Sequence, residues 1–188
     1  MCHAVDRKVT TALAGGKVRN VRGFTLPELM ITVSVLGLLL TVGIPGFRNI
    51  VMNNQLVTQA NEFAYAVSLA RSAAIKRQRN ASICVSTTYN ASPPTCTGGT
   101  NWASGWVVWV DQDNDAVLDD GEAIRVNEPF GGSTVFTSGA KSSFQYNPMG
   151  LVDGPDTLTA CDSRSGETGR QINVSPAGRV NTSSVTCS

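Results

Sequence analysis

The amino-acid sequence predicts an α+β fold in which one long N-terminal helix precedes a small domain rich in β-strands. From Phe24 to about Asn80 the chain reads as helix, first as a continuous apolar run and then with apolar residues at every third or fourth position. After Asn80, short β-branched and aromatic segments alternate with turn residues, which is typical of an antiparallel sheet. Four cysteines in this second part indicate disulfide bonds.

Residues 1–23 form a basic segment that ends in glycine. Its five basic side chains are those of Arg7, Lys8, Lys17, Arg19 and Arg22. A secretory signal peptide is cut after its apolar part, whereas here the apolar part follows Gly23. Cleavage at Gly23 would remove the charges and keep the helix. We therefore expect residues 1–23 to be a removable leader.

The apolar run from Leu29 to Phe47 is long enough to cross a membrane. Its 19 residues would rise about 28 Å as a helix, close to the roughly 30 Å of a bilayer's hydrocarbon core. Glu28 is the only ionisable residue between Phe24 and Phe47. A carboxylate at such a depth costs a few kcal/mol unless it is paired, so Glu28 is a candidate functional residue. The alternative is an ordinary signal anchor with Glu28 at the membrane interface.

The stretch Arg22-Gly23-Phe24-Thr25-Leu26-Pro27-Glu28 resembles the class III signal of type IV pilins and type II secretion pseudopilins. The resemblance implies that a prepilin peptidase cuts between Gly23 and Phe24 and methylates the amine of Phe24. It also implies that Glu28 offers its carboxylate to the N-terminal amine of a neighbouring subunit. The chain would then be a single-pass protein of the bacterial inner membrane, with its C-terminal domain in the periplasm, before it enters a filament.

The helix should continue beyond the apolar run as an amphipathic half, residues 48–80. Apolar residues recur there on one stripe, made by Leu56, Ala60, Phe63, Val67, Ala70 and Ala74. Pro45 lies between Gly43 and Gly46 and should bend or locally melt the helix half formed by residues 24–47. The alternative is that the helix ends near Gly43 and restarts. Basic residues from Lys76 to Arg79 suit the negative end of the helix dipole, and the alternative is a patch that binds nucleic acid.

The remaining residues, 81–188, should form one antiparallel sheet domain. Strands are expected at Ser82–Ser86, Gly105–Val110, Ala123–Val126, Thr134–Phe136, Ser143–Tyr146, Thr157–Ala160 and Gln171–Val174. The segments around Ala70–Ile75, Gly105–Asp111 and Ile172–Val180 are similar to those of the GspH/FimT family, which comprises minor type IV pilins of the FimT or FimU kind and pseudopilin H of type II secretion. That resemblance implies the type IV pilin-like fold, with the sheet packed on the second half of the helix.

The cysteines and the single histidine limit the chemistry of the mature protein. Cys2 and His3 lie in the leader, and Cys84, Cys96, Cys161 and Cys187 remain. An even number in an exported domain favours two disulfides, and we favour Cys84 with Cys96 and Cys161 with Cys187 because each pair closes a short segment. Zinc is the competing interpretation, although no CxxC pair is present. Without histidine the mature chain has no Ser-His-Asp machinery, so we predict no enzyme and no cofactor.

An acidic loop from Asp111 to Glu122 has the oxygen spacing of an EF-hand. Acidic side chains occupy loop positions 1, 3, 5, 9 and 12, which are Asp111, Asp113, Asp115, Asp119 and Glu122. Alternate carboxylates of such a loop can converge on one calcium ion. However, position 6 is Ala116 where a sharp turn favours glycine, and strands flank the loop. The alternative is an acidic hairpin loop in water.

Charge argues against bulk binding of nucleic acid. Without the leader, ten basic and thirteen acidic side chains remain, a net charge of −3. Some FimT-like minor pilins bind DNA through arginines in the C-terminal region, including a Gly-Arg-x-Arg motif. This chain resembles them in part of that motif. Here the matching residues are Gly178-Arg179-Val180-Asn181, with Asn181 in place of a second arginine. Arg164, Arg170 and Arg179 are therefore candidate DNA contacts, and each could equally be a solvated surface residue.

These observations lead to three functional hypotheses. The first is a minor type IV pilin that helps to start pilus assembly at the tip, for twitching motility or adhesion. The second is pseudopilin H of a type II secretion system, and the third is a DNA-binding minor pilin in natural transformation. In each case the resemblance implies that other pilins or pseudopilins, the prepilin peptidase and the inner membrane are the partners.

Overall fold

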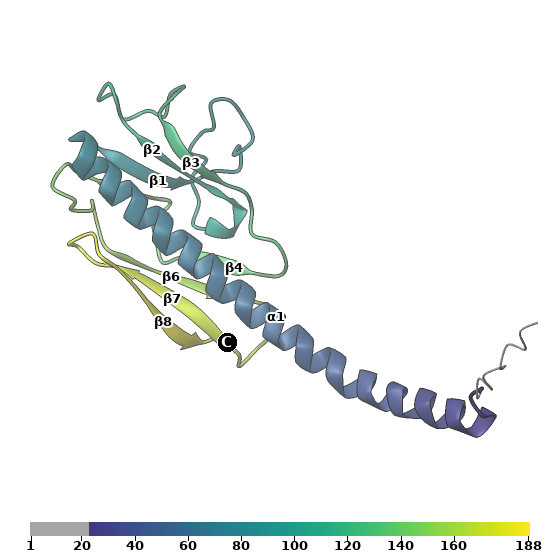
Figure 1. The fold of residues 1–188 in the computed structure, drawn as a ribbon. Coiled ribbons are helices and arrows are strands. Elements are labelled where there is room, and N and C mark those ends of the chain that lie inside the picture. Colours follow the sequence, from purple (N-terminus) through teal and green to yellow (C-terminus); the bar gives the residue numbers. More distant parts are fainter. Residues whose placement is uncertain (1–22) are drawn as a thin grey trace, which may run out of the picture. The chain divides into compact units, whose positions relative to one another are not determined.

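The computed structural model of this chain describes residues 23–188, so most of the expected leader, residues 1–22, lies outside the described residues. The described chain begins with one long helix, α1 (Leu26–Arg77), which is followed by strands and a short 3₁₀ helix (Figure 1). These elements are β1 (Ala81–Val85), η1 (Trp102–Ser104), β2 (Trp106–Val110), β3 (Ala123–Asn127), β4 (Val135–Ser138), β5 (Ser143–Tyr146), β6 (Asp156–Cys161), β7 (Thr168–Val174) and β8 (Val180–Thr186). The chain divides between Ile44 and Pro45 into two compact units.

The second half of α1 is amphipathic, as its sequence predicts. All six residues of the expected apolar stripe are buried: Leu56, Ala60, Phe63, Val67, Ala70 and Ala74. The helix ends at Arg77, within the expected basic segment, because Gln78 turns to a positive φ of 54°. The backbone N–H of Arg79 then donates to the carbonyl of Ala74 at 3.3 Å and closes the last turn.

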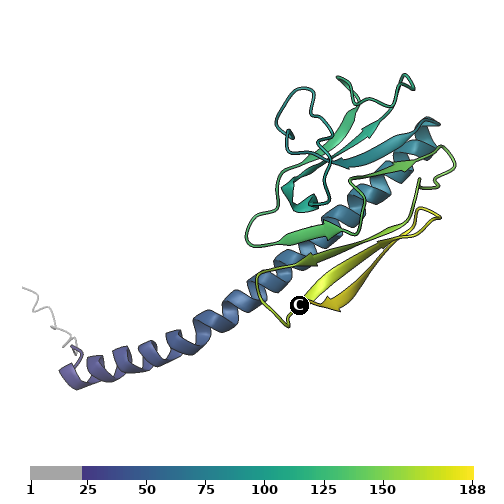
Figure 2. The ribbon, with the colours of Figure 1, turned by 180° about the vertical axis from the view of Figure 1, so that it is seen from behind.

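The β-domain contains two antiparallel sheets, where the sequence pattern led us to expect one. The first sheet has the strand order β3-β2-β1-β5, and the second has the order β4-β6-β7-β8. Every pair of neighbouring strands in both sheets is antiparallel. Figures 1 and 2 show the two sheets on either side of the second half of α1. Two sheets can cover both flanks of one apolar stripe, which explains why the stripe is buried so completely.

Strand β8 was not expected from the sequence. It pairs with β7 along its whole length, from Thr168 opposite Thr186 to Val174 opposite Val180. Most of its side chains are polar and exposed, so the strand has no apolar alternation. The other strands lie where their sequences place them, within one or two residues at each end, except that β7 begins at Thr168, three residues before the expected Gln171.

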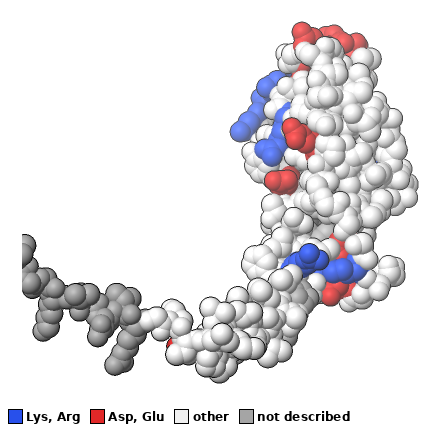
Figure 3. All heavy atoms as spheres, turned by 90° about the vertical axis from the view of Figure 1, so that its right-hand side faces the viewer, with Lys and Arg blue, Asp and Glu red and all other residues white. Residues whose placement is uncertain are grey.

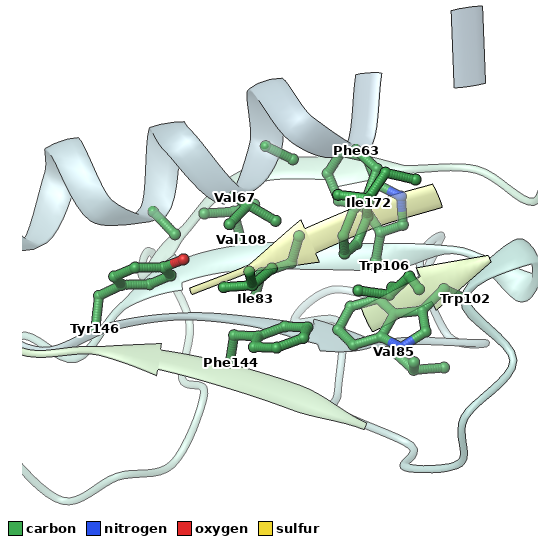
Figure 4. Packing of buried hydrophobic residues seen from close by; sticks show 14 of the residues in the cluster. Phe63, Val67, Ile83, Val85, Trp102, Trp106, Val108, Phe144, Tyr146 and Ile172 are labelled. Carbon is green, nitrogen blue, oxygen red and sulfur yellow. The ribbon is translucent and has the colours of Figure 1, made fainter. Parts of the chain in front are cut away.

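One hydrophobic core joins α1 to both sheets (Figure 4). The ring of Phe63 packs edge-on against Phe136 of the second sheet, with centroids 4.9 Å apart, and against Trp102 at 5.0 Å. Trp102 in turn stacks on Phe144 of the first sheet at 5.6 Å. Because the indole N–H of Trp102 donates to the carbonyl of Lys141 at 3.1 Å, this large side chain is buried without an unsatisfied donor. The core therefore fixes α1 relative to both sheets within this unit.

Candidate functional site

The start of α1 places Glu28 in a local cap. The backbone N–H of Thr25 donates to Oε2 of Glu28 at 3.5 Å, and the N–H of Leu29 donates to the carbonyl of Thr25 at 3.1 Å. Thr25-Leu26-Pro27-Glu28 thus has the spacing of a capping box and one of its two contacts, the bond from the Thr25 N–H to the Glu28 carboxylate. We missed this role of Glu28 in the sequence, although a threonine three residues before a glutamate is its usual signal. The carboxylate is exposed and keeps oxygen lone pairs for a further donor.

The first half of α1 presents its apolar side chains outward. Leu26 is 74% exposed and Leu38 is 71% exposed. Among residues 23–188, α1 is the one helix long and apolar enough to cross a membrane, and none of its most apolar stretch is buried. Figure 3 shows this part of the helix as a nearly uncharged surface. Such a surface requires a cover of lipid tails or of other apolar helices.

Pro45 does not interrupt α1. The helix is continuous from Leu26 to Arg77, so our predictions of a locally melted segment, or of a helix that ends near Gly43 and restarts, are wrong for this structure. A proline removes only one backbone hydrogen bond, and the bonds on either side can maintain a helix. The boundary between the two compact units nevertheless falls directly before Pro45.

Both expected disulfides are present. Cys84 is bonded to Cys96, with their Cα atoms 5.6 Å apart, and Cys161 is bonded to Cys187, with a separation of 5.9 Å. Every cysteine in residues 23–188 is therefore used, which excludes the competing zinc-thiolate site there. The second bond connects the end of β6 to the segment after β8, so it holds the C-terminal residues against the second sheet.

Arg164 is engaged in a clamp and is not a free surface cation. It donates from Nη2 to Oδ2 of Asp162 at 2.6 Å and from Nε to both carboxylate oxygens at 3.0 Å. Nη2 also donates to Oδ1 of Asn53 at 2.7 Å, and Nη1 donates to Oδ1 of Asn49 at 3.3 Å. Because Asp162 neutralises this guanidinium, Arg164 has little charge left for an external phosphate.

The three predicted DNA contacts do not form one site. Arg164 contacts α1 at Asn49 and Asn53, whereas Arg179 lies beside α1 near Arg71. These positions on the helix are about 20 residues apart, or roughly 30 Å at the rise of an α-helix. Arg170 donates to the hydroxyl of Ser184 on β8 at 2.9 Å. Binding of DNA remains a prediction, and the three arginines do not support it as a cluster.

Arg179 instead shares a basic groove with Arg71 and Lys76, a grouping that the sequence analysis did not predict. This groove lies between α1 and the turn that joins β7 to β8, and it has a volume of about 550 Å³. Its walls are Ser68, Arg71, Ser72, Ile75, Lys76, Gly178, Arg179 and Val180. The lining includes three cations and no carboxylate. Lys76 was interpreted from the sequence as a partner of the helix dipole, a local signal that does not reveal this grouping.

The acidic loop, residues 111–122, is folded around its own carboxylates. Asp111 is buried and accepts the backbone N–H groups of Asn114 at 2.7 Å and Ala116 at 3.2 Å. Glu122 is also buried and accepts those of Gln112 at 2.6 Å and Asp119 at 3.2 Å. Ala116 has a positive φ of 63°, so this alanine adopts the turn for which glycine is usually preferred.

The structure brings some of the predicted calcium ligands together. Oxygens of Asp111, Asp113 and Asp115 lie within 4.8 Å of one another. Asp119 and Glu122 are not members of that group, and the two oxygens of Glu122 face backbone N–H donors. Partial desolvation and the nearby carboxylates of Asp115 and Asp113 raise the pKa of Asp119. Calcium binding therefore stays a prediction, because hydrogen bonds within the loop already account for its geometry.

Comparison with protein families gives two matches. A family described as "Type II transport protein GspH" matches residues 59–178, and one described as "Prokaryotic N-terminal methylation motif" matches residues 18–44. The first match covers α1 from residue 59 onward and the β-domain up to the turn before β8. The second covers the apolar half of α1 with Gly23, Phe24 and Glu28. No curated protein sequence matches the chain.

Two crystal forms of the type IV minor pilin FimU of Pseudomonas aeruginosa have a similar fold. In one form the sequence identity is 18%, and the match covers 71% of this chain and 92% of FimU with a TM-score of 0.56. In the other form the identity is also 18%, with coverages of 67% and 90% and a TM-score of 0.51. At this identity the likeness shows the fold, which is the α+β arrangement of a long helix and antiparallel sheets.

Proposed function

Since the chain belongs to the GspH family of pilin-like structural proteins, we propose that it is a minor type IV pilin that enters the filament near its tip and helps to start assembly. The observation that carries this proposal is the exposed, apolar first half of α1, which directly follows Gly23-Phe24-Thr25 and contains Glu28 as its one ionisable residue. The name of the similar FimU structures, a type IV minor pilin, supports the same assignment.

The proposed mechanism is helix packing in two environments. In the inner membrane the exposed apolar side chains of α1 contact lipid, while the β-domain lies in the periplasm, where both disulfides are stable. In the filament the same surface packs against the apolar helices of other subunits. The transfer exchanges one apolar environment for another, so it needs no large gain in hydrophobic free energy.

Glu28 supplies the specificity of this packing. Cleavage after Gly23 would create a new amine at Phe24, and an ammonium group of a neighbouring subunit can donate to the Glu28 carboxylate. Such a charge-assisted hydrogen bond is stronger in an apolar filament core than in water. The cap formed with Thr25 uses one oxygen weakly, at 3.5 Å, and leaves the carboxylate able to accept this donor.

Intact mass tests processing, and two Glu28 variants test assembly. In cells with an active prepilin peptidase, the protein should start at a methylated Phe24 and be lighter by four hydrogens for its two disulfides. Glu28→Gln can keep the capping hydrogen bond but loses the charge, whereas Glu28→Val loses both. We expect both variants to insert in the membrane and to be missing from sheared filaments. Normal incorporation of either variant would contradict the role of the Glu28 charge, and an unprocessed wild-type chain would contradict the whole proposal.

The second candidate is pseudopilin H of a type II secretion system, which is favoured by the match to the type II transport protein GspH family. Both candidates use the same helix packing in different machines. Deletion of the gene distinguishes them, because loss of a minor pilin should abolish surface pili and leave protein secretion intact. Loss of secreted enzymes with normal pili would support the pseudopilin instead.

A further inference from the structure

The edge strands of the two sheets are β3, β5, β4 and β8. Residues 151–153 cover β5, where the N–H of Asp153 donates to the carbonyl of Gln145 at 2.9 Å. The segment before η1 covers β4, where the N–H of Ser138 donates to the carbonyl of Thr100 at 3.1 Å. Strand β3 carries the charged Arg125, and a bulge interrupts its pairing with β2. Charges and bulges are usual protections of an edge, so the chain itself covers or protects each of these three strands.

Strand β8 has none of these protections. Its sequence, Val-Asn-Thr-Ser-Ser-Val-Thr, contains no charged residue and no proline, and its seven residues pair with β7 without a bulge. Strand β7 is its one strand neighbour, and no described residue bonds to its backbone on the other side. Figures 1 and 2 both show β8 as the outermost strand of the second sheet. A long, regular and open edge of this kind is a template for another strand.

The register shows which backbone groups of β8 are free. The N–H of Ser175 donates to the carbonyl of Arg179, and the N–H of Cys187 donates to that of Glu167, both at 2.9 Å. The residue pairs between these two bonds are in continuous register. Because bonded and non-bonded pairs alternate in an antiparallel ladder, the odd-numbered residues of β8 bond to β7. The N–H and C=O groups of the even-numbered residues therefore point away from β7, at Val180, Thr182, Ser184 and Thr186.

The chemistry of this edge fits an extended, polar segment of another chain. A row of free N–H and C=O groups is complementary to the backbone of an added strand. Thr182 and Ser184 lie on one face of β8, Asn181 and Ser183 lie on the other, and all four are exposed. Short polar side chains such as Ser and Thr pair favourably across neighbouring strands. The added strand should therefore be polar on both faces.

The basic groove lies at the first residue of β8. Val180 is one of its walls, together with Arg71, Lys76 and Arg179. None of the ion pairs within 4 Å among residues 23–188 includes these three cations. Like charges around one groove raise the local potential and attract an anion. A strand that pairs with β8 reaches the groove with one end, so an acidic residue at that end would be complementary in charge.

We propose that β8 pairs with an extended polar segment of a different pilin subunit, and that an acidic residue of this segment lies in the basic groove. The inference rests on the proposed function, because a minor subunit near the tip has other pilins as its neighbours. Packing of α1 joins subunits through apolar contacts. Strand pairing adds backbone hydrogen bonds, and the charge in the groove selects the partner and its register.

Proline at positions that face away from β7 tests the edge. Thr182→Pro with Ser184→Pro removes two outward N–H groups and keeps the bonds to β7, so the Tm of the full chain in detergent micelles should change little. Thr182→Ala with Ser184→Ala is the matched control, because it shortens the same side chains and keeps both N–H groups. Ser183→Pro removes a bond to β7 and should lower the Tm, which checks the alternation.

Two further variants leave every backbone bond in place. Thr182→Lys with Ser184→Lys gives β8 the charges that protect natural edges, so it tests the edge even if the prolines disturb the fold. Lys76→Glu with Arg179→Glu reverses the charge of the groove. Both of these cations are exposed, and their side chains make no described hydrogen bond or ion pair, so the fold should be kept.

Photo-crosslinking in cells that assemble the filament measures the contact. With p-benzoylphenylalanine at Ser183, we expect light to produce an adduct in the membrane fraction whose cross-linked peptide belongs to a different pilin, as identified by mass spectrometry. The same group at Val117, a side chain that is 54% exposed on the acidic loop, reports the background. The adduct should decrease about tenfold in the proline variant, because two hydrogen bonds are lost. It should also decrease in the lysine and groove variants and stay unchanged in the alanine control.

Several results would overturn this inference. They are an adduct with a second copy of this chain or with a protein that is not a pilin, and an adduct from Ser183 no stronger than that from Val117. Unchanged adducts in proline and lysine variants that keep the Tm of the wild type would also contradict pairing at β8. An adduct that ignores the reversed groove would refute the acidic residue. Processing at Phe24 and the Glu28 variants test the proposed function separately, so failure here leaves that function intact.

Discussion

Arg164 connects the loop between β6 and β7 to α1 by a hydrogen bond to Asn53, 2.7 Å long, across 111 positions of sequence. The same guanidinium holds Asp162, whose side chain is only 4% exposed. The clamp contacts α1 at Asn49 and Asn53, a few residues after the boundary between the two compact units. The clamp therefore attaches the part of α1 that begins the second unit to the second sheet.

Removal of the clamp should destabilise the β-domain. Arg164→Ala leaves the carboxylate of Asp162 nearly buried without its main partner, which costs more than the pair contributed. We expect the Tm to fall by several degrees, and hydrogen exchange of α1 to increase near residues 49–53. Asn53→Ala, which removes one acceptor and keeps the ion pair, should have a clearly smaller effect. Equal effects of the two variants would show that the ion pair itself contributes nothing.

The same pair predicts lability to acid. Hydrogen bonds from Arg164 hold the pKa of Asp162 below its ordinary value of 3.8. Burial raises the pKa of Asp156, but hydrogen bonds from the N–H groups of Thr157, Ala140 and Lys141 lower it by more. A carboxyl with a lowered pKa stabilises the fold above its unfolded pKa, and this contribution is lost as the pH falls through the folded pKa. The Tm should thus decrease as the pH falls below about 4.

Two variants distinguish the contribution of individual carboxyl groups to acid lability from the general effect of low pH on the Tm. In Asp162→Asn the Tm near pH 6 should be lower and its decrease below about pH 4 shallower than in the wild type. Asp119 has the opposite sign, because its raised pKa favours the protonated form in the folded state. Asp119→Asn should therefore raise the Tm at neutral pH and lose this advantage in acid. Identical pH profiles of Asp162→Asn and the wild type would refute the prediction.

Phe63 should be the most sensitive position of α1 in the core. Its ring contacts those of Trp102 and Phe136 at about 5 Å and lies 6.3 Å from that of Trp106. Phe63→Ala removes these contacts and leaves a cavity, so we expect a loss of about 3–5 kcal/mol in the free energy of unfolding. Chemical denaturation measures this. As a control, Met149→Ala removes a side chain that is 75% exposed and should change the free energy of unfolding by less than about 0.5 kcal/mol.

The two disulfides should stabilise the fold unequally. They close loops with sequence separations of 12 and 26 residues. The chain-entropy account predicts about 3 kcal/mol for each and roughly 0.7 kcal/mol more for the longer loop. Replacement of Cys161 and Cys187 by alanine should therefore cost more than that of Cys84 and Cys96, in denaturation under non-reducing conditions. The reverse order would show that strain or unfolded-state structure outweighs loop entropy.

Much of the candidate site could be predicted from sequence because its signals are local. The uncharged run after Gly23, the single Glu28 and the apolar stripe from Leu56 to Ala74 each depend on composition or on the helical period. The disulfide pairs were also predictable, since each closes a short segment. In contrast, β8 is polar and mostly exposed, so it has no pattern, and it exists because β7 offers a free edge.

The sequence by itself determined the hydrophobic half of α1, the buried face of its second half and the presence of strands, because side-chain period and polarity decide which surfaces avoid water. Only the tertiary structure decided that the strands form two sheets, that Arg164 binds Asn53 and that Arg179 joins Arg71 and Lys76. These relationships join residues far apart in the chain. Such pairings follow from how the sheets pack on the helix, and no local period encodes them.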